Sequence, residues 1–577
     1  MKCCFSKIVD LSLIFVVIVL SAVGCSEDET VAPEEGGKIQ LLNILSNPLS
    51  PRPGTVDTLA PRMVGTSTGE RVSYQWRVSG GVLLEDNEGV VRWQVPEEKG
   101  DYPVTLRISV AGKVDSMVKI ISVRDQEFID TGRLHSIYPK VINGTLYFIS
   151  PFYSRFINPD DRYSFADFVY YGADLYSYED STVSTRITEG LFDDVEINHR
   201  EEGATYFGFT DDGQKLITSV YNDYSDADPM PHMNIGRYDL MGGPGTKITY
   251  NMDGQSTLGR YNQYRHPSFN SDGSAIVMEF IQAGEEGDGS EDLVNIAFWE
   301  EGDGHIPETI TESVDTVIVK GLSFPVFYQN ILPQMTPDGN NIIYFSNRIS
   351  VLDTLPNYYE PYLVPMAGGE PDTSRTEFFD IVRDSRVRIG RNSIFQWSPT
   401  GDMAVFKATI NMVPTLCYLN YNSLDPSISI DVSGLTKVQE FAWAPDGSMG
   451  AIIDQDGVHL VSPGGGRIGQ VLDKERDTDD VYGVNWSRDG DKIAFRLVRK
   501  GKVWSDSWNA IMEYSVSEDV LTFVSEGYRW EKRDEPGDID YRWKRVHYDE
   551  TGGIYAPVFT SAEENALVSV SRIVHLY

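Results

Sequence analysis

A short motif that recurs along most of the chain constrains its fold more than any other feature. Each copy has a large apolar residue, a small polar residue, a turn ending in glycine and then an apolar strand. Asp-Gly supplies the positive φ that a tight hairpin requires, and a preceding proline presets the first corner of the turn. The six clearest copies are Phe209–Gly213, Phe269–Gly273, Met335–Gly339, Trp397–Gly401, Trp443–Gly447 and Trp486–Gly490.

The spacing of the copies predicts a ring of small antiparallel sheets. Starting from a weaker copy at Asn143-Gly144, consecutive turn glycines are 69, 60, 66, 62, 46 and 43 residues apart. The two shortest spacings match one four-stranded propeller blade, and the longer ones need only loop insertions. A second weak copy, from Phe559 to Val568, brings the favoured count to eight blades, with seven as the alternative. Because Tyr555–Tyr577 supplies at most three strands, we expect residues 126–134 to add the fourth and close the ring, which removes exposed sheet edges.

The six copies resemble the WD-like Trp-Ser-Pro-Asp-Gly repeats of TolB-type β-propellers. The resemblance extends over residues 130–577 and implies that this part of the chain is an all-β propeller domain. Relatives of the prolyl peptidases also carry such propellers, together with a hydrolase domain that we do not expect here.

Residues 38–124 carry short alternating segments that are typical of a small β-sandwich. Two motifs resemble those of PKD-like immunoglobulin domains: the Tyr-x-Trp of Tyr74–Trp76, followed by Gly80-Gly81, and the Gly-x-Tyr-x-Val-x-Leu of Gly100–Leu106. The Asp-Phe-Gly-Asp-Gly run of the PKD family is missing, so we expect an immunoglobulin-like sandwich. The resemblance implies a spacer or adhesion unit.

The first 24 residues have the organisation of an export signal. Lys2 and Lys7 precede the apolar run Leu11–Leu20, which is too short to span a bilayer. The residues that follow, Ala22-Val23-Gly24-Cys25, resemble a bacterial lipobox, which implies that Cys25 is acylated, for example with palmitate; an ordinary signal-peptidase site is the alternative. Several acyl chains anchor a protein stably. The acidic segment 25–37 is expected to be a linker, and its first residues resemble the export signal of surface lipoproteins.

The charge of the chain excludes most nucleic-acid binders. It has 49 Lys and Arg against 86 Asp and Glu, which gives a net charge of -37. The phosphate backbone of a nucleic acid would therefore be repelled. Acidic runs such as Glu285–Asp288 and Asp473–Asp480 lack the Asp-x-Asp-x-Asp-Gly spacing of a calcium loop. We therefore expect no cofactor, although structural calcium is left open.

No residues of the sequence form a recognisable catalytic or metal site. The eight histidines lack metal-ligand spacing, and no Cys-x-x-Cys pair is present. Gly65–Gly69 matches the nucleophile-elbow pattern of serine hydrolases, but it lacks the strand-to-helix context of that motif. We therefore expect that the protein is not an enzyme.

Insertions in the repeats predict where a ligand binds. The Asp-Gly turn joins the first two strands of a blade, so the segment after the second strand emerges on the opposite face. Loops gathered on one face of a rigid scaffold often carry recognition, and Tyr and Trp offer large rigid contact areas. The alternative is that these aromatic residues pack against their own loops. The candidate ligand-binding residues are Tyr153, Asp160, Asp161, Tyr163, Tyr224, Asp226, Tyr358, Tyr359, Trp504 and Trp508.

These features predict an outer-membrane lipoprotein, exposed at the cell surface, whose propeller binds a protein, peptide or glycan without catalysis. The lipid anchor is its expected membrane contact. One alternative is a periplasm-facing component of an envelope assembly, as the resemblance to TolB implies. Another is a lyase or glycosidase with its site in the central funnel, which would need convergent carboxylates or a metal there.

Overall fold

Within the residues that the computed structural model describes, every named secondary-structure element is a β-strand, so the predicted all-β class is confirmed. In the part of the chain that it describes, no helix has the length and apolarity needed to cross a membrane. The described residues are 40–47, 51–64, 71–87, 89–129, 131, 137–155, 168–178, 184–187, 196–197, 207–210, 212–222, 232–240, 246–249, 263–282, 293–302, 307–319, 322–348, 359–366, 395–410, 413–421, 427–430, 435, 438–474, 479–499, 508–528, 546–561 and 569–577.

The chain divides into two units, the first formed by Met1–Pro48, Thr55–Pro96 and Tyr102–Lys119. One sheet has the order β1-β2-β5-β4, and β3, β6 and β7 pair in a second sheet. The Trp93 side chain is fully buried, and its indole N–H donates to the Gly80 carbonyl over 2.9 Å. Assignment to the immunoglobulin-like class stays a prediction. The strands are β1 (Gln40–Asn47), β2 (Val56–Val64), β3 (Val72–Val78), β4 (Val82–Asn87), β5 (Val90–Gln94), β6 (Gly100–Val110) and β7 (Lys113–Val123).

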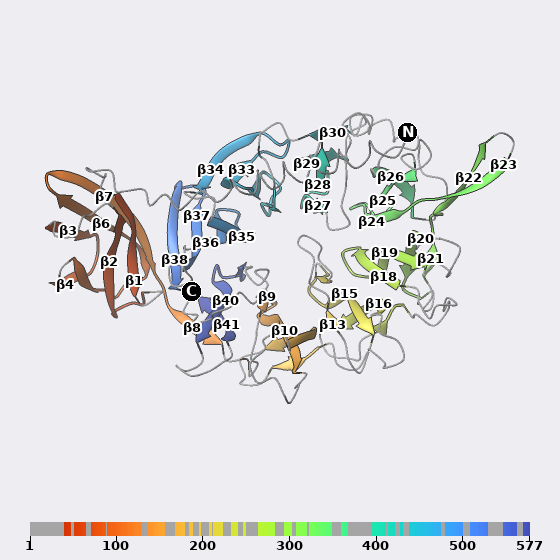
Figure 1. The fold of residues 1–577 in the computed structure, drawn as a ribbon. Helices are drawn as coiled ribbons and strands as arrows, with labels where there is room; N and C mark the ends of the chain where they lie inside the picture. Colours follow the sequence, from red (N-terminus) through yellow and green to blue (C-terminus); the bar gives the residue numbers. More distant parts are fainter. Residues whose placement is uncertain are drawn as a thin grey trace, which may run out of the picture. The chain divides into compact units, whose positions relative to one another are not determined.

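The second unit comprises Leu49–Gly54, Glu97–Asp101 and Ile120–Tyr577, and it has the propeller-type fold that the repeats predict. Its described residues form successive antiparallel sheets, numbered here in chain order (Figure 1). Sheets 1 to 4 contain β9 (Ile137–Ile142), β10 (Thr145–Arg155), β11 (Phe168–Tyr178) and β12 (Thr185–Arg186); β13 (Glu196–Ile197), β14 (Phe207–Phe209), β15 (Lys215–Asn222), β16 (His232–Asp239) and β17 (Thr246–Lys247); β18 (Gln263–Phe269), β19 (Ala275–Gln282), β20 (Leu293–Glu300) and β21 (Glu308–Thr309); and β24 (Asn330–Met335), β25 (Asn341–Ser346) and β26 (Glu360–Pro365).

Sheets 5 to 8 follow the same antiparallel plan, and a separate hairpin lies between sheets 3 and 4 in the sequence. The hairpin consists of β22 (Val314–Val319) and β23 (Leu322–Phe327). Sheets 5 to 8 contain β27 (Phe395–Trp397), β28 (Met403–Ile410), β29 (Val413–Asn420) and β30 (Ser427–Ile430); β31 (Glu440–Trp443), β32 (Gly450–Ile453), β33 (Gly457–Val461) and β34 (Arg467–Asp473); β35 (Asp479–Trp486), β36 (Lys492–Arg499), β37 (Trp508–Ser515) and β38 (Val520–Tyr528); and β39 (His547–Tyr548), β40 (Ile554–Ser561), β41 (Ser569–Leu576) and β8 (Gln126–Ile129).

The last sheet joins the two ends of the second unit. Strand β8 pairs antiparallel with β41, with Phe128 opposite Val574. This pairing confirms the expectation that residues 126–134 supply a strand to the final sheet. Ile129 of β8 and Ile573 of β41 also share an apolar cluster with Leu146 of β10. Because sheet 8 thereby packs against sheet 1, the series of sheets closes on itself.

Apolar clusters connect each sheet to the next. Sheets 1 and 2 share the cluster that contains Tyr147 and Leu216, and sheets 2 and 3 share the one that contains Ile217 and Ile276. Further clusters join sheets 3, 4 and 5, sheets 5 and 6, sheets 6 and 7, and sheets 7 and 8. The core is therefore a set of apolar layers between neighbouring sheets, which is how the alternating apolar residues of each strand become buried.

The turn between the first two strands explains the sequence motif. In sheet 4, the Thr336 carbonyl accepts from Gly339 N over 2.8 Å, and the Thr336 hydroxyl accepts from Asn341 N over 3.0 Å. That hydroxyl donates to Asp338, which also accepts from Asn340 N over 3.1 Å. Sheets 2 and 7 repeat these bonds around Asp212 and Asp489. A small hydroxyl residue and an aspartate therefore satisfy the turn backbone while glycine takes the positive φ, 69° at Gly339.

The turn of sheet 8 differs from the expected one. It is formed by Asp549–Gly553, where the Asp549 carboxylate accepts from the N–H groups of Thr551 and Gly553, each over 2.8 Å. The repeat copy expected at Phe559–Val568 is therefore wrong, because Phe559 lies within β40 and pairs with Ser571 of β41. In this turn Asp549 occupies the place that serine or threonine occupies in four of the other copies, and Thr551 precedes the turn glycine, so the Asp-Gly pattern does not mark it.

Candidate functional site

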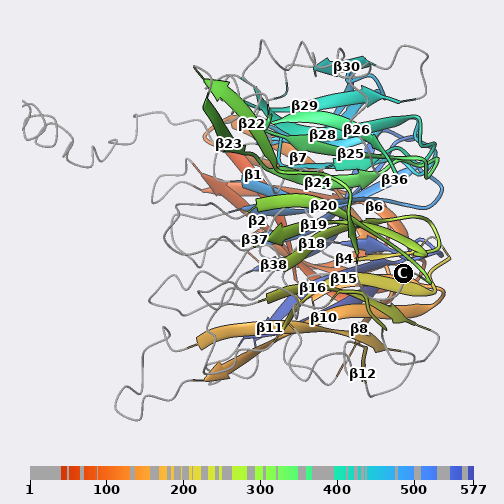
Figure 2. The same cartoon turned by 90° about the vertical axis from the view of Figure 1, so that its right-hand side faces the viewer.

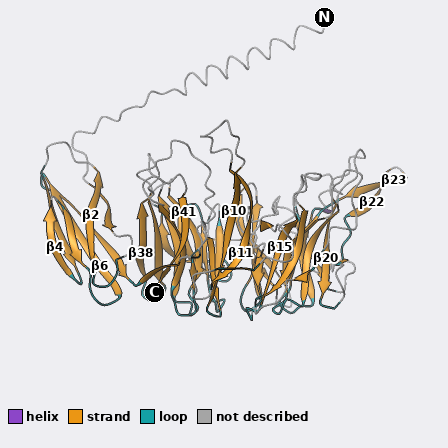
Figure 3. Cartoon of the chain, turned by 90° about the horizontal axis from the view of Figure 1, so that it is seen from below, coloured by secondary structure: helices purple, strands orange, loops and turns teal. Residues whose placement is uncertain are grey.

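The sheets send their long connections to one edge. The first strand of each sheet reaches its second strand through a tight turn, and Figure 3 shows the described turns of the second unit along one edge, called here the turn edge. Second strands therefore end at the opposite edge, called here the loop-bearing edge. Sheets 5 and 6 connect their second and third strands within a few residues, whereas the other six sheets have longer connections, at 156–167, 223–231, 283–292, 347–359, 500–507 and 562–568. Most of these connecting residues lie outside the described part of the chain.

Three of the predicted ligand-binding residues lie in the described part. Tyr153 is in β10 opposite Tyr170, and Trp508 begins β37 opposite Arg499. Both belong to strands and not to the connecting segments in which we expected them, because the hairpins of sheets 1 and 7 extend further than the sequence pattern indicates. Tyr359 is the third. The predicted residues that lie outside the described part are Cys25, Asp160, Asp161, Tyr163, Tyr224, Asp226, Tyr358 and Trp504.

Tyr359 has a structural contact at the loop-bearing edge. Its hydroxyl donates to the Gln329 side chain over 2.8 Å, and its ring packs against the apolar cluster of sheets 3 to 5. The Gln329 N–H in turn donates to the Asn347 side chain over 2.7 Å. Tyr359 thus helps to hold the start of sheet 4, and a role in ligand binding stays a prediction.

A buried charge cluster lies on the inner strands of sheets 3 and 4. Glu279 of β19 has no exposed surface and contacts Arg265 Nε of β18 over 2.8 Å and His266 Nδ1 over 2.9 Å. It also accepts from the Leu332 N–H of β24 over 2.8 Å. Burial raises the pKa of Glu279, but His266 and Arg265 outweigh it and hold the pKa well below its usual value. Glu279 is therefore an ionised carboxylate that joins two sheets.

The backbone is strained at both ends of this cluster. His266 and Leu332 have φ values of 51° and 52°, in the left-handed region that non-glycine residues seldom adopt. Each precedes a proline and sits at a register shift of its strand, β18 or β24. The shifts turn the His266 ring and the Leu332 N–H toward Glu279. This cluster escaped sequence reasoning, although a signal existed: Pro267 and Pro333 each stand six residues before the turn glycine.

Hydrogen bonds also join the first strands of neighbouring sheets, which Figure 1 shows nearest the centre of the ring. Ser268 of sheet 3 accepts from Met335 N of sheet 4 over 3.1 Å. Glu440 of sheet 6 accepts from Gly483 N of sheet 7 over 2.8 Å, and Asn485 of sheet 7 accepts from Tyr548 N of sheet 8 over 3.3 Å. These bonds fix the inner strands relative to one another, which makes the second unit a rigid scaffold for its connections.

A second acid–imidazole pair lies at the loop-bearing edge of sheet 6. His459 Nε2 is 3.0 Å from Asp454 Oδ1, and both side chains are buried. The same carboxylate accepts from Asp456 N and Gly457 N, over 2.8 and 2.9 Å, so it organises the turn between β32 and β33. Within the described ranges, no three His, Cys, Asp or Glu side chains are grouped to hold a metal ion.

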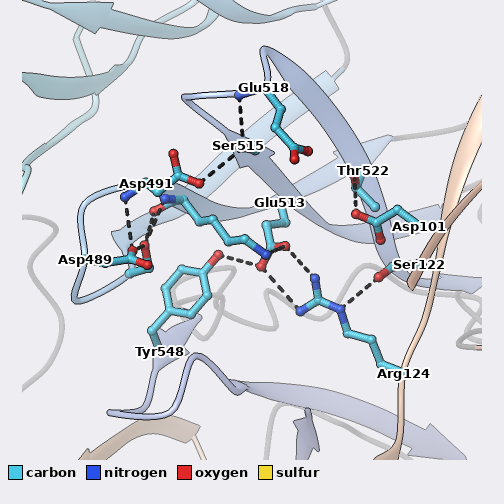
Figure 4. Close-up of polar contacts among 12 residues, drawn as sticks. Asp101, Ser122, Arg124, Asp489, Asp491, Glu513, Ser515, Glu518, Thr522 and Tyr548 are labelled. Carbon is cyan, nitrogen blue, oxygen red and sulfur yellow. Dashed lines mark hydrogen bonds and ion pairs between the residues drawn. The ribbon is translucent and has the colours of Figure 1, made fainter. Parts of the chain in front are cut away.

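A further buried cluster fastens the segment that leads into β8. Figure 4 shows Glu513 of β37 between Arg124 and Tyr548. Arg124 makes two hydrogen bonds to the carboxylate, Lys492 Nζ lies 3.0 Å from it, and the Tyr548 hydroxyl donates over 2.8 Å. Burial raises the pKa of Glu513, but Arg124 and Lys492 outweigh it and keep the pKa below its usual value. The carboxylate thus ties the residues ahead of β8 to sheets 7 and 8.

Comparison with known proteins identifies no family for the chain: no protein-family model and no curated protein matches it. Solved structures similar to it include a prolyl endopeptidase, with 11% identity, 78% of this chain and 55% of that chain covered and a TM-score of 0.40. A TolB-type protein from Agrobacterium tumefaciens has 13% identity and a TM-score of 0.26, and the match covers 55% of this chain and 93% of that chain. An oligogalacturonate lyase from Vibrio parahaemolyticus has 11% identity, coverages of 78% and 96% and a TM-score of 0.36.

These similarities concern the fold alone, and the chain spans about half the length of the prolyl endopeptidase. They nevertheless contradict the expectation that the protein is not an enzyme, because prolyl oligopeptidases and a lyase are among the similar structures. That expectation rested on the lack of a recognisable catalytic motif in the sequence, and a site assembled from separate sheets leaves no such motif. The expectation is withdrawn.

Proposed function

We propose that the protein is an exported, lipid-anchored envelope protein whose loop-bearing edge binds a protein, peptide or glycan. The observation that carries this proposal is the concentration of long connections at one edge of a scaffold whose inner strands are tied together. Loops held by such a scaffold are where proteins commonly place their recognition residues. The proposal concerns ligand recognition, which a propeller enzyme also requires.

The export part of the proposal is supported by the sequence around Cys25. Acylation of Cys25 would place the protein in the outer membrane, and the acidic residues after it favour the cell surface over the periplasm. The net charge of -37 argues against nucleic acid as the ligand.

The proposal predicts that aromatic residues of the connections carry the affinity for the ligand. We expect the triple variant Tyr224→Ala, Tyr358→Ala, Trp504→Ala to recover at least about tenfold less partner from envelope extracts than the wild type. Tyr359 is left unchanged because it supports sheet 4 through Gln329. The measurement is quantitative pull-down with the full chain, followed by mass spectrometry.

The matched control places three substitutions near the turn edge. Arg488→Ala, Glu550→Ala and Glu301→Ala change side chains that are more than half exposed, so we expect unchanged partner recovery and an unchanged melting temperature. Equal recovery by the two triple variants would refute the assignment of the ligand to the loop-bearing edge.

A further inference from the structure

The hairpin β22–β23 is set apart from the sheets around it. Its strands pair only with each other among the described residues, in a two-stranded sheet between β21 of sheet 3 and β24 of sheet 4. Figure 1 and Figure 2 show it, in green, extending past the ends of the neighbouring strands. As a connection from a fourth strand to the next first strand, it rises from the loop-bearing edge. Isolated two-stranded hairpins are marginally stable in water, so this one needs support.

The base of the hairpin is fixed to sheets 3 and 4. Tyr328 N donates to the Ser313 carbonyl over 2.9 Å and closes the hairpin at its foot. The Asn330 side chain donates to the Glu312 carbonyl over 2.9 Å and links the foot to β24. The hairpin therefore leaves the ring in a defined direction.

One face of the hairpin is apolar and open to solvent. Val314 and Phe327 stand opposite each other and are 39% and 42% exposed. Ser323 and Pro325 are exposed on the same face, since alternate residues of a strand share a face. Adjacent exposed apolar side chains of this kind are suited to contact with another chain.

The two edges of the hairpin differ in their hydrogen-bonding groups. Residues that flank a two-residue turn form a hydrogen-bonded pair, and the pairs then alternate along the ladder. From Val319 opposite Leu322, this alternation leaves Thr316 and Ile318 with outward N–H groups on β22. On β23 the corresponding position opposite Thr316 is Pro325, which has no N–H. The outer edge of β22 therefore offers an N–H group at both of these positions, whereas the outer edge of β23 lacks one at Pro325.

We infer that the β22 edge is a docking site for a β-strand of a partner protein, which extends the hairpin to three strands. The added strand supplies backbone hydrogen bonds to Thr316 and Ile318, and its apolar side chains cover a face of the hairpin. Glu312 is exposed directly before β22, and Asp315 lies within it. The partner segment is thus extended, alternates apolar and polar residues, and carries Lys or Arg at its ends.

Charge decides against two other occupants. A second copy of this chain would bring another net charge of -37 to the contact, and a membrane of anionic lipids would repel the chain in the same way. A partner strand that carries Lys or Arg is instead attracted by the negative charge of this chain. This inference goes beyond the proposed function, because it concerns the hairpin and not the longer connections, and variants of one region leave the other unchanged.

The test measures binding of a fluorescent, lysine-flanked peptide of alternating valine and threonine to the full chain by anisotropy. Ile318→Pro removes the outward N–H of β22, and Ser323→Pro is the matched control, because Ser323 faces Ile318 across the ladder and its N–H points to the other edge. We expect Ile318→Pro to weaken peptide binding at least about tenfold and Ser323→Pro to change it less than about twofold. A glutamate-flanked peptide is expected to bind about tenfold more weakly.

Circular dichroism spectra and melting temperatures of both proline variants are measured to check that each remains folded. Absence of peptide binding to the wild type, or equal loss in both variants, would overturn the inference. Two other results would also overturn it. If the wild type bound phosphatidylglycerol vesicles and Ile318→Pro did not, the edge would be a lipid site. If the wild type formed dimers in sedimentation and Ile318→Pro did not, the edge would be an interface with a second copy.

Discussion

Glu279→Ala is expected to lower the free energy of unfolding of the second unit by about 3–5 kcal/mol, because it removes a fully buried carboxylate that pairs with Arg265 and His266. Arg265 and His266 face the fully buried carboxylate, and the Leu332 N–H loses its acceptor. Since the pKa of Glu279 is lower in the folded chain than its usual value of 4.5, the contribution is present above about pH 4.5 and is lost as the pH falls. The difference between variant and wild type should therefore shrink in acid.

Urea denaturation followed by tryptophan fluorescence measures this effect, because eight of the ten tryptophans lie within residues 120–577. The control is Glu301→Ala, which removes an ion pair to Arg237 whose carboxylate side is 51% exposed. Exposed pairs of this kind contribute less than about 1 kcal/mol. If the two variants lost the same stability, the buried cluster would not have the structural role assigned to it.

Glu513→Ala is expected to have a comparable effect, about 3–5 kcal/mol, and to free the segment that leads into β8. The carboxylate is 3% exposed, and its removal leaves Arg124, 13% exposed, without its ion-pair partner. The Tyr548 hydroxyl also loses its acceptor. Because Arg124 directly precedes the residues that pair with β41, we expect faster amide exchange in Gln126–Ile129 as well as in β36 and β37.

Hydrogen–deuterium exchange with peptide-level mass spectrometry tests this second expectation. Glu518→Ala is the matched control, since Glu518 lies in the exposed turn between β37 and β38 and donates its backbone N–H to the Ser515 hydroxyl, a bond that alanine keeps. We expect no change in β8 for this control. Unchanged exchange in Gln126–Ile129 of Glu513→Ala would show that the cluster does not hold the closing strand.

Local chemistry made much of the fold predictable. Residues such as Thr336, Asp338 and Gly339 form their turn through bonds within a few residues, so the sequence motif contains the whole structure of the turn. The strand from residues 126–129 was predictable because the last hairpin lacked a partner. The turn at Asp549–Gly553 was missed because the single Asp549 carboxylate accepts both backbone N–H bonds there, which in the turn of Thr336 and Asp338 are divided between a hydroxyl and a carboxylate.

The buried charge clusters were not predictable, because they depend on contacts between distant sheets. Glu279 meets Leu332 of the next sheet, and Glu513 meets Arg124, which is 389 residues away in the sequence. Period and spacing describe single strands and carry no information on which side chains face each other across sheets. The proline at the same place in two successive repeats was the one local sign of the first cluster.

The central claim is a ring closed by the pairing of β8 with β41, and an engineered disulfide tests it most directly. Phe128 and Val574 stand opposite each other in a pair without mutual backbone bonds, where Cβ atoms approach most closely. We predict that oxidised Phe128→Cys, Val574→Cys gives a linked peptide pair in mass spectrometry and a raised melting temperature. The control, Phe128→Cys with His575→Cys, places the thiols on opposite faces and should not link. No linked peptide from the first variant, or equal linking in both, would contradict ring closure by these strands.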